Sequence, residues 1–175
     1  TGYVVVRAGA VDEPAEYTGL AHYLEHMLFK GTDRIGALDW AKEKPLYEQI
    51  IALYDTLALT TDEQAREAVQ LRINEVSREA AQYAATDEFS NLIQGIGGEG
   101  LNAFTSYDVT CYMNSFPSYQ MERWLTLYAD RLTNPVFRSF QAELENVFEE
   151  YNMYLDDNST HVRNFIFGKL YEGHA

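Results

Sequence analysis

The sequence of 175 residues contains a single cysteine, so no disulfide can form within the chain. Only 13 lysines and arginines stand against 27 aspartates and glutamates, and the net charge of −14 disfavours binding to nucleic acids or anionic membranes. No apolar run is long enough to span a bilayer. The glycine cluster at 95–100 lacks the Gly-Lys-Ser/Thr of a phosphate-binding loop, which argues against a nucleotide site.

Two of the four histidines stand four residues apart, in the run His22-Tyr23-Leu24-Glu25-His26. Residues with this spacing lie on one face of an α-helix, so both imidazoles can reach one metal ion. Glu25 lies at the edge of the same face, where its carboxylate can move a proton. This H-x-x-E-H pattern is the inverzincin signature, and it predicts a zinc hydrolase with His22 and His26 as ligands and Glu25 as the general base.

A catalytic zinc site needs a third protein ligand, and the residue types alone leave several candidates. These are Cys111, His161, His174 and a large number of carboxylates. The segment 140–151 is predicted to be a helix, and Glu143 and Glu150, seven residues apart, share one of its faces. The same periodicity predicts that the apolar residues of this helix form its buried side, namely Leu144, Val147, Tyr151 and Tyr154.

Three blocks of the sequence resemble the M16 metallopeptidases, the family of pitrilysin, insulin-degrading enzyme and mitochondrial processing peptidase. The blocks are the run 19–32 around the histidines, the run 102–106, and the helix that contains Glu143 and Glu150. The resemblance implies one zinc ion per domain, held by His22, His26 and Glu150, with Glu143 supporting the ligands. It also implies a substrate-binding strand at a sheet edge, formed by Asn102, Ala103, Phe104 and Thr105, of which Asn102 and Ala103 contact the peptide backbone.

The predicted function is therefore zinc-dependent endopeptidase activity on peptides or unfolded polypeptides through a metal-activated water. The resemblance implies a second M16-like half, in the same chain or a separate subunit, which supplies an arginine and a tyrosine. Both termini look cut, so we expect a fragment that binds zinc but has weak or no activity alone. The resemblance leaves the compartment open, with a bacterial periplasm or cell envelope favoured over a mitochondrial matrix.

Two alternative functions remain. The first is a non-catalytic M16-like subunit or scaffold, although the predicted ligands and Glu25 are all present. The second is a metalloenzyme similar to S-ribosylhomocysteine lyase, which also carries H-x-x-E-H but uses one cysteine as a ligand and another in catalysis. Cys111 alone cannot fill both roles.

The predicted fold class is α+β, with an antiparallel sheet packed against helices. Residues 1–175 are expected to form a single, truncated catalytic domain. In the M16 family, fewer residues usually separate the second histidine from the distal glutamate than separate His26 from Glu150 here. The resemblance therefore implies an insertion. Two apolar stripes at helical spacing predict that residues 40–84 form an inserted antiparallel αα-hairpin that turns at 59–62.

Overall fold

The computed structural model describes residues 1–171, and this part of the chain divides into two compact units. Unit 1 combines Thr1–Met27, Gly100–Ser115 and the chain from Phe140 onward. Unit 2 combines Leu28–Glu99 and Phe116–Ser139. The residues predicted to form the site, 22–26, 102–105 and 143–150, all belong to unit 1.

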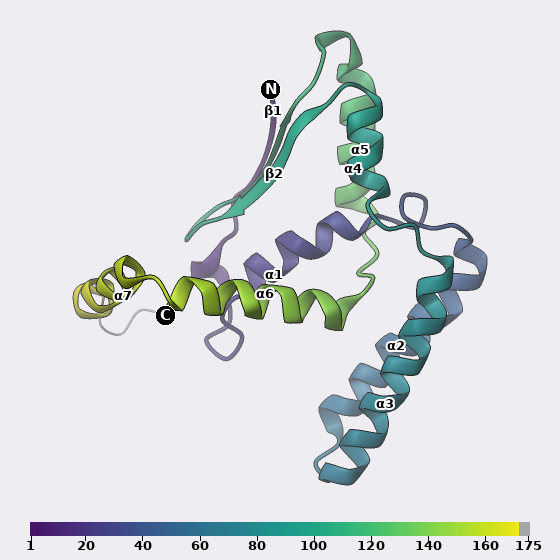
Figure 1. Ribbon diagram of the computed structural model, residues 1–175, viewed down its shortest axis with the longest axis vertical. Coiled ribbons are helices and arrows are strands. Elements are labelled where there is room, and N and C mark those ends of the chain that lie inside the picture. The colour runs from purple at the N-terminus through teal and green to yellow at the C-terminus, as the bar shows by residue number, and fades with distance from the viewer. Residues whose placement is uncertain (172–175) are drawn as a thin grey trace. The chain divides into compact units, whose positions relative to one another are not determined.

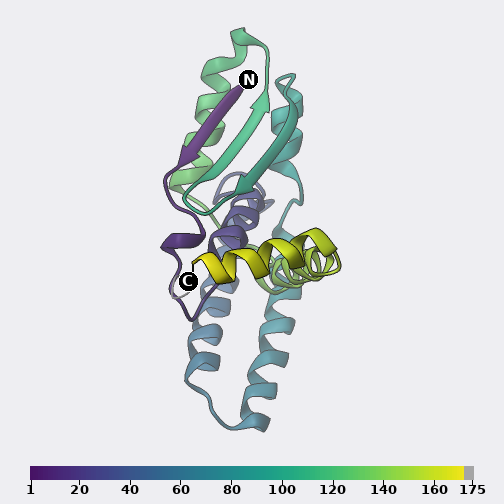
Figure 2. The ribbon, with the colours of Figure 1, turned by 90° about the vertical axis from the view of Figure 1, so that its left-hand side faces the viewer.

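Unit 1 is built on a sheet of three strands in the order β1-β3-β2, which Figure 2 shows side by side. The strands are β1 (Gly2–Val6), β2 (Glu99–Thr105) and β3 (Thr110–Ser115). Strand β1 is rich in valine, which favours extended backbone, and pairs antiparallel with β3 so that Val4 lies opposite Tyr112. Strand β2, which contains the block 102–105, lies at the edge of this sheet, as the resemblance implies.

Three helices complete unit 1: α1 (Leu20–Met27), α6 (Phe140–Leu155) and α7 (Asn158–Leu170). A short 3-10 helix, η1 (Ala10–Asp12), precedes α1. Helix α1 packs against α6, and the Tyr23 hydroxyl donates to the Phe140 carbonyl at 2.6 Å. Helix α7 begins at Asp157, whose carboxylate accepts from the Ser159 and Thr160 amides as an N-cap.

Unit 2 contains the predicted helical hairpin, formed by α2 (Trp40–Leu59) and α3 (Glu63–Ala80) (Figure 1). Asp39 and Asp62 cap the two N-termini by accepting from the amides of Lys42 and Ala65. The Arg66 guanidinium closes the turn by donating to the carbonyls of Leu57 and Thr60. The remaining elements are η2 (Leu28–Lys30), η3 (Ala81–Tyr83), α4 (Glu88–Gly95), η4 (Ser118–Gln120) and α5 (Met121–Thr133).

A buried ion pair lies at the base of this hairpin. Arg138 donates to both carboxylate oxygens of Glu43, at 2.5 and 2.9 Å, and both side chains are buried. The same guanidinium donates to the carbonyls of Lys30 and Thr32, at 3.0 and 2.7 Å. One arginine therefore ties the first turn of α2 to the loop that follows η2.

A second buried carboxylate, Asp130 of α5, accepts hydrogen bonds from Thr32, Arg34 and Asn134. Burial acts to raise the pKa of Asp130, but the hydrogen bonds from these residues outweigh it and hold the pKa below its ordinary value. Burial alone raises the pKa of the Cys111 thiol in β3 of unit 1.

The predicted α+β fold is confirmed. The helix with the two histidines, the helix predicted over 140–151 and the two helices of the hairpin are present, with boundaries that differ by a few residues. The predicted buried side of α6 is wrong for Leu144, Tyr151 and Tyr154, which are exposed. Leu144 and Tyr151 line an open groove of about 560 Å³ between α6 and the start of α1.

Among residues 1–171, no helix combines the length and apolar character needed to cross a membrane.

Candidate metal centre

Helix α1 carries the two histidines, and its first turn is fixed by a residue outside the helix. The Glu13 carboxylate accepts from the backbone amides of Gly19 and Ala21, both at 2.7 Å. These amides have no intrahelical acceptor, and a carboxylate at a helix N-terminus also interacts favourably with the helix dipole. Gly19, at φ +91°, adopts the left-handed conformation that lets the chain enter the helix. Glu13 thus fixes the turn that presents His22.

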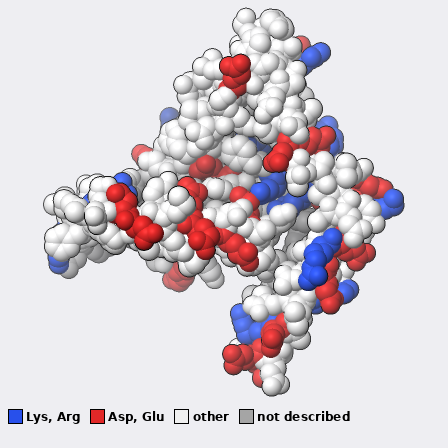
Figure 3. Space-filling model, in the orientation of Figure 1, with Lys and Arg blue, Asp and Glu red and all other residues white. Residues whose placement is uncertain are grey.

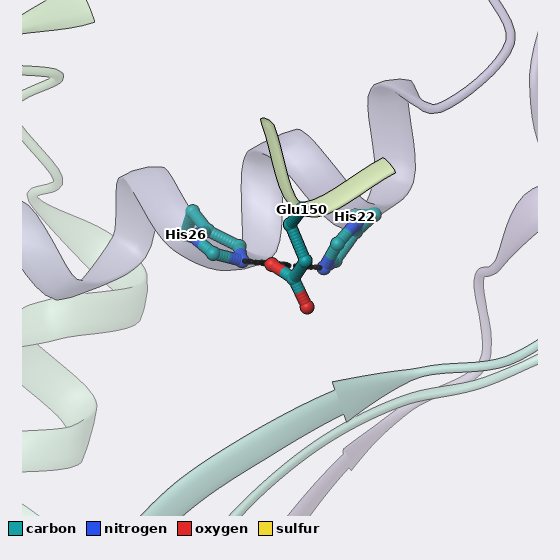
Figure 4. Close-up of side chains that lie close together, drawn as sticks. All are labelled: His22, His26 and Glu150. Carbon is teal, nitrogen blue, oxygen red and sulfur yellow. Dashed lines mark hydrogen bonds and ion pairs between the residues drawn. The ribbon is translucent and has the colours of Figure 1, made fainter. Parts of the chain in front are cut away.

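The ring nitrogens of the two histidines and the Glu150 carboxylate converge, as Figure 4 shows. His22 Nε2 lies 3.2 Å from His26 Nε2. Glu150 Oε2, from α6, lies 3.4 Å from His26 Nε2 and 3.8 Å from His22 Nε2. Within residues 1–171, this is the one group of three histidine, cysteine, aspartate or glutamate side chains that could hold a metal.

The separations within this group fit a tetrahedral zinc site. Zinc bonds to nitrogen and oxygen are about 2.0–2.2 Å long, so adjacent ligand atoms of a tetrahedral site lie about 3.3 Å apart. The separations of 3.2, 3.4 and 3.8 Å bracket this value. Two imidazoles and one carboxylate are also the donor types of catalytic zinc sites.

Glu143 holds the His26 ring from its other nitrogen. His26 Nδ1 lies 2.9 Å from Glu143 Oε1, and Asn146 donates to Glu143 Oε2 at 3.3 Å. When Nδ1 carries the proton and donates it to the carboxylate, Nε2 keeps its lone pair for a cation. Because Glu143 is buried and Glu150 half-buried, the two carboxylates that share one face of α6 have different environments.

Glu25 is buried and points to the sheet. Its Oε2 accepts a hydrogen bond from the Thr105 hydroxyl at 2.5 Å, across two segments 80 residues apart in sequence. Side chains alternate along a strand, so Leu101, Ala103 and Thr105 share the face of β2 that is half-buried. Asn102 and Phe104 lie on the opposite, exposed face.

The other candidates for the third ligand do not join the group. Cys111 is buried in β3, and His161 is exposed on α7. His174 lies outside the described residues. Acidic side chains gather along α6 in Figure 3. Glu145 and Glu149 of this helix are exposed. Glu149 therefore faces solvent and does not join the group of candidate ligands.

Unit 1 thus combines a small antiparallel sheet and helices with a candidate metal centre. The chain belongs to the insulinase family of peptidases (peptidase family M16), whose model matches residues 1–43 and 76–175. The unmatched residues, 44–75, cover most of α2 and α3.

Two curated relatives carry the name zinc protease, and two solved structures share the fold. The chain is 24% identical to an uncharacterized zinc protease of Streptomyces coelicolor over 95% of its length, and 27% identical to one of Mycobacterium leprae over 98%. It spans only 26% and 28% of those two proteins. A protease from Helicobacter pylori has a similar fold, with a TM-score of 0.57, 20% identity, and coverage of 88% of this chain and 26% of that one. Pitrilysin gives a TM-score of 0.50 at 19% identity, covering 88% and 11%.

Proposed function

We propose that the chain is the metal-binding part of a zinc-dependent endopeptidase. The observation that carries the proposal is the convergence of His22, His26 and Glu150 within ligand distance of one another. Membership of the M16 family and the names of two zinc proteases among the relatives support zinc as the metal. Each domain would hold one zinc ion.

Bound zinc would supply Lewis acidity, which activates water and polarises the scissile carbonyl. Glu25 would take the proton of the attacking water and deliver it to the leaving amine. Its place on α1, next to His26 in the sequence, supports this role, because a general base must lie close to the metal-bound water. Glu143 would orient the His26 ring without touching the metal.

Peptide substrates would bind along β2. The strand is at the sheet edge, where backbone groups are available to pair with an added strand. Asn102 and Ala103 would make these backbone contacts. Phe104, whose side chain is 45% exposed, would contact substrate side chains, and Thr105 marks the end of the strand nearest to Glu25. Such binding selects an extended backbone, so unfolded polypeptides are suitable substrates.

A second M16-like half would complete the active site, either later in the same chain or as a separate subunit. The chain spans about a quarter of the length of its curated relatives, which is consistent with this arrangement. We also propose that residues 40–84 are an insertion into the family domain. The unmatched span 44–75 falls inside it and supports this interpretation.

Zinc stoichiometry tests the proposal. The chain is stripped with a chelator and reloaded, and zinc is measured by elemental analysis beside the Glu150→Ala and Glu149→Ala variants. We expect close to one zinc per chain in the parent and in Glu149→Ala, which alters a solvated neighbour, and a sharp loss in Glu150→Ala. No zinc in the parent would instead favour a non-catalytic M16-like subunit. Full zinc in Glu150→Ala would reject that residue as the third ligand. The lyase-like alternative has no support in the family match.

A further inference from the structure

The Thr105 hydroxyl is already engaged within the protein. It donates to Glu25 Oε2 at 2.5 Å, and Glu25 is only 6% exposed. A charged acceptor makes this hydrogen bond stronger than one between neutral groups. The bond joins the edge strand β2 to the helix that carries the two histidines.

We propose that Thr105 is a positioning residue, which holds the Glu25 carboxylate in the orientation for proton transfer. This inference rests on the proposed peptidase function. A glutamate side chain has three rotatable bonds, and fixing them costs conformational entropy that a single hydrogen bond can offset. With Oε2 held by the hydroxyl, the second oxygen, Oε1, is left to take the proton.

This role differs from contact with substrate. A side chain that binds peptide directly would affect substrate and transition state alike, and its loss would raise KM. A group that aligns the base acts in the proton-transfer step, so its loss lowers kcat and leaves KM nearly unchanged. Thr105 faces the half-buried side of β2 with Ala103, whereas Asn102 and Phe104 face outward.

The test uses three substitutions in the zinc-loaded chain. Thr105→Val keeps the shape of the side chain and removes the hydroxyl, and Thr105→Ser keeps the hydroxyl. Thr110→Val is the matched control, because the Thr110 hydroxyl in the neighbouring strand donates to the Ala8 carbonyl at 2.9 Å and does not contact Glu25. Zinc content is measured in every variant, so that loss of the metal is not mistaken for loss of positioning.

Two readouts are taken. The first is kcat and KM on a fluorogenic peptide, where we expect a fall in kcat of roughly tenfold to a hundredfold for Thr105→Val, little change in KM, and recovery in Thr105→Ser. The second is the affinity for acetohydroxamic acid, measured by calorimetry. Binding to zinc transfers the proton of the acid to a nearby base, so we expect affinity to fall roughly tenfold in Thr105→Val alone.

The outcomes separate the two proposals. Absence of zinc from the reloaded parent would overturn the proposed peptidase function. If the parent binds zinc and acetohydroxamic acid but cleaves no peptide, turnover requires the second M16-like half, and the affinity series alone decides the role of Thr105. Equal kcat and equal acetohydroxamate affinity in Thr105→Val and the parent would overturn the positioning role. A rise in KM with unchanged kcat would also overturn it, in favour of substrate contact.

Discussion

Glu143 lies against the His26 ring, with its Oε1 2.9 Å from Nδ1, and so leaves Nε2 facing His22. With the proton on Nδ1, this contact would orient the ring and keep the Nε2 lone pair available for a metal. Glu143 and Glu150 both belong to α6, and Glu143 is buried. One helix would therefore supply a ligand, Glu150, and the support for another ligand, His26.

Removing this support should weaken the metal site without deleting a ligand. We expect Glu143→Ala to lower zinc affinity by roughly tenfold to a hundredfold, while one zinc still binds at saturating concentration. Competition with a chromophoric chelator measures the affinity. Glu145→Ala, on the exposed face of the same helix, serves as the control. A zinc affinity unchanged in Glu143→Ala would show that His26 needs no partner at Nδ1.

Glu25→Gln should separate metal binding from proton transfer. Glutamine has nearly the same shape, and its amide oxygen can still accept from the Thr105 hydroxyl, so the fold and the zinc content should be retained. Hydrolysis of a fluorogenic peptide should fall by a factor of about 10²–10⁴, because the amide cannot take a proton. Loss of zinc from this variant, measured by elemental analysis, would contradict the assignment of Glu25 as base rather than ligand.

Asp130 predicts a pH dependence of stability in unit 2. Its pKa in the folded protein is lowered, so the ionised carboxylate contributes stability above the ordinary aspartate pKa of about 3.9. That contribution is lost as the pH falls through the folded-state pKa. Asp130→Asn should lower the free energy of unfolding by about 1–3 kcal/mol at neutral pH, and the difference from the parent should shrink in acid.

Urea unfolding at several pH values, followed by tryptophan fluorescence, measures this effect. Trp40 and Trp124, the two tryptophans of the chain, both belong to unit 2 and report its unfolding. Asp55→Asn, at an exposed position of α2, is the control. If the difference in the free energy of unfolding between Asp130→Asn and the parent stayed constant from neutral pH to acid, Asp130 would be ruled out as the source of the pH dependence.

Local patterns in the sequence were sufficient for one part of the site. Helical spacing alone places His22 and His26 on one face, and it places Glu143 and Glu150 on another, because both relations depend only on the geometry of a single helix. That α6 would lie beside α1 follows from no such pattern and came from the resemblance to the M16 family. The structure brings these residues together as that resemblance implies.

Contacts between distant segments could not be predicted in this way. Glu13 reaches the first turn of α1 only because the loop between them folds back, and nothing in the sequence distinguishes it from the other acidic residues. Thr105 belongs to a block assigned to substrate binding, and its bond to Glu25 depends on how β2 packs. The apolar spacing of α6 predicted burial for Leu144 and Tyr151, but periodicity cannot show whether any segment covers the face.

The buried pair of Arg138 and Glu43 gives a stability prediction for the base of the helical hairpin. Removing one partner leaves the other charge buried and uncompensated, so Arg138→Met or Glu43→Gln should lower the free energy of unfolding of unit 2 by about 3–5 kcal/mol. The double variant, with Glu43→Leu and Arg138→Met, should lose less than the sum of the two, because neither charge remains.

An exposed ion pair on the same hairpin is the matched control. Arg72 lies 2.9 Å from Glu75 on α3, and both side chains are more than half exposed, so Arg72→Met should change stability by less than about 1 kcal/mol. Tryptophan fluorescence during urea unfolding compares all the variants. Equal effects of Arg138→Met and Arg72→Met would mean that burial does not strengthen the pair, and that the hydrogen bonds from Arg138 to the carbonyls of Lys30 and Thr32 do not stabilise the hairpin.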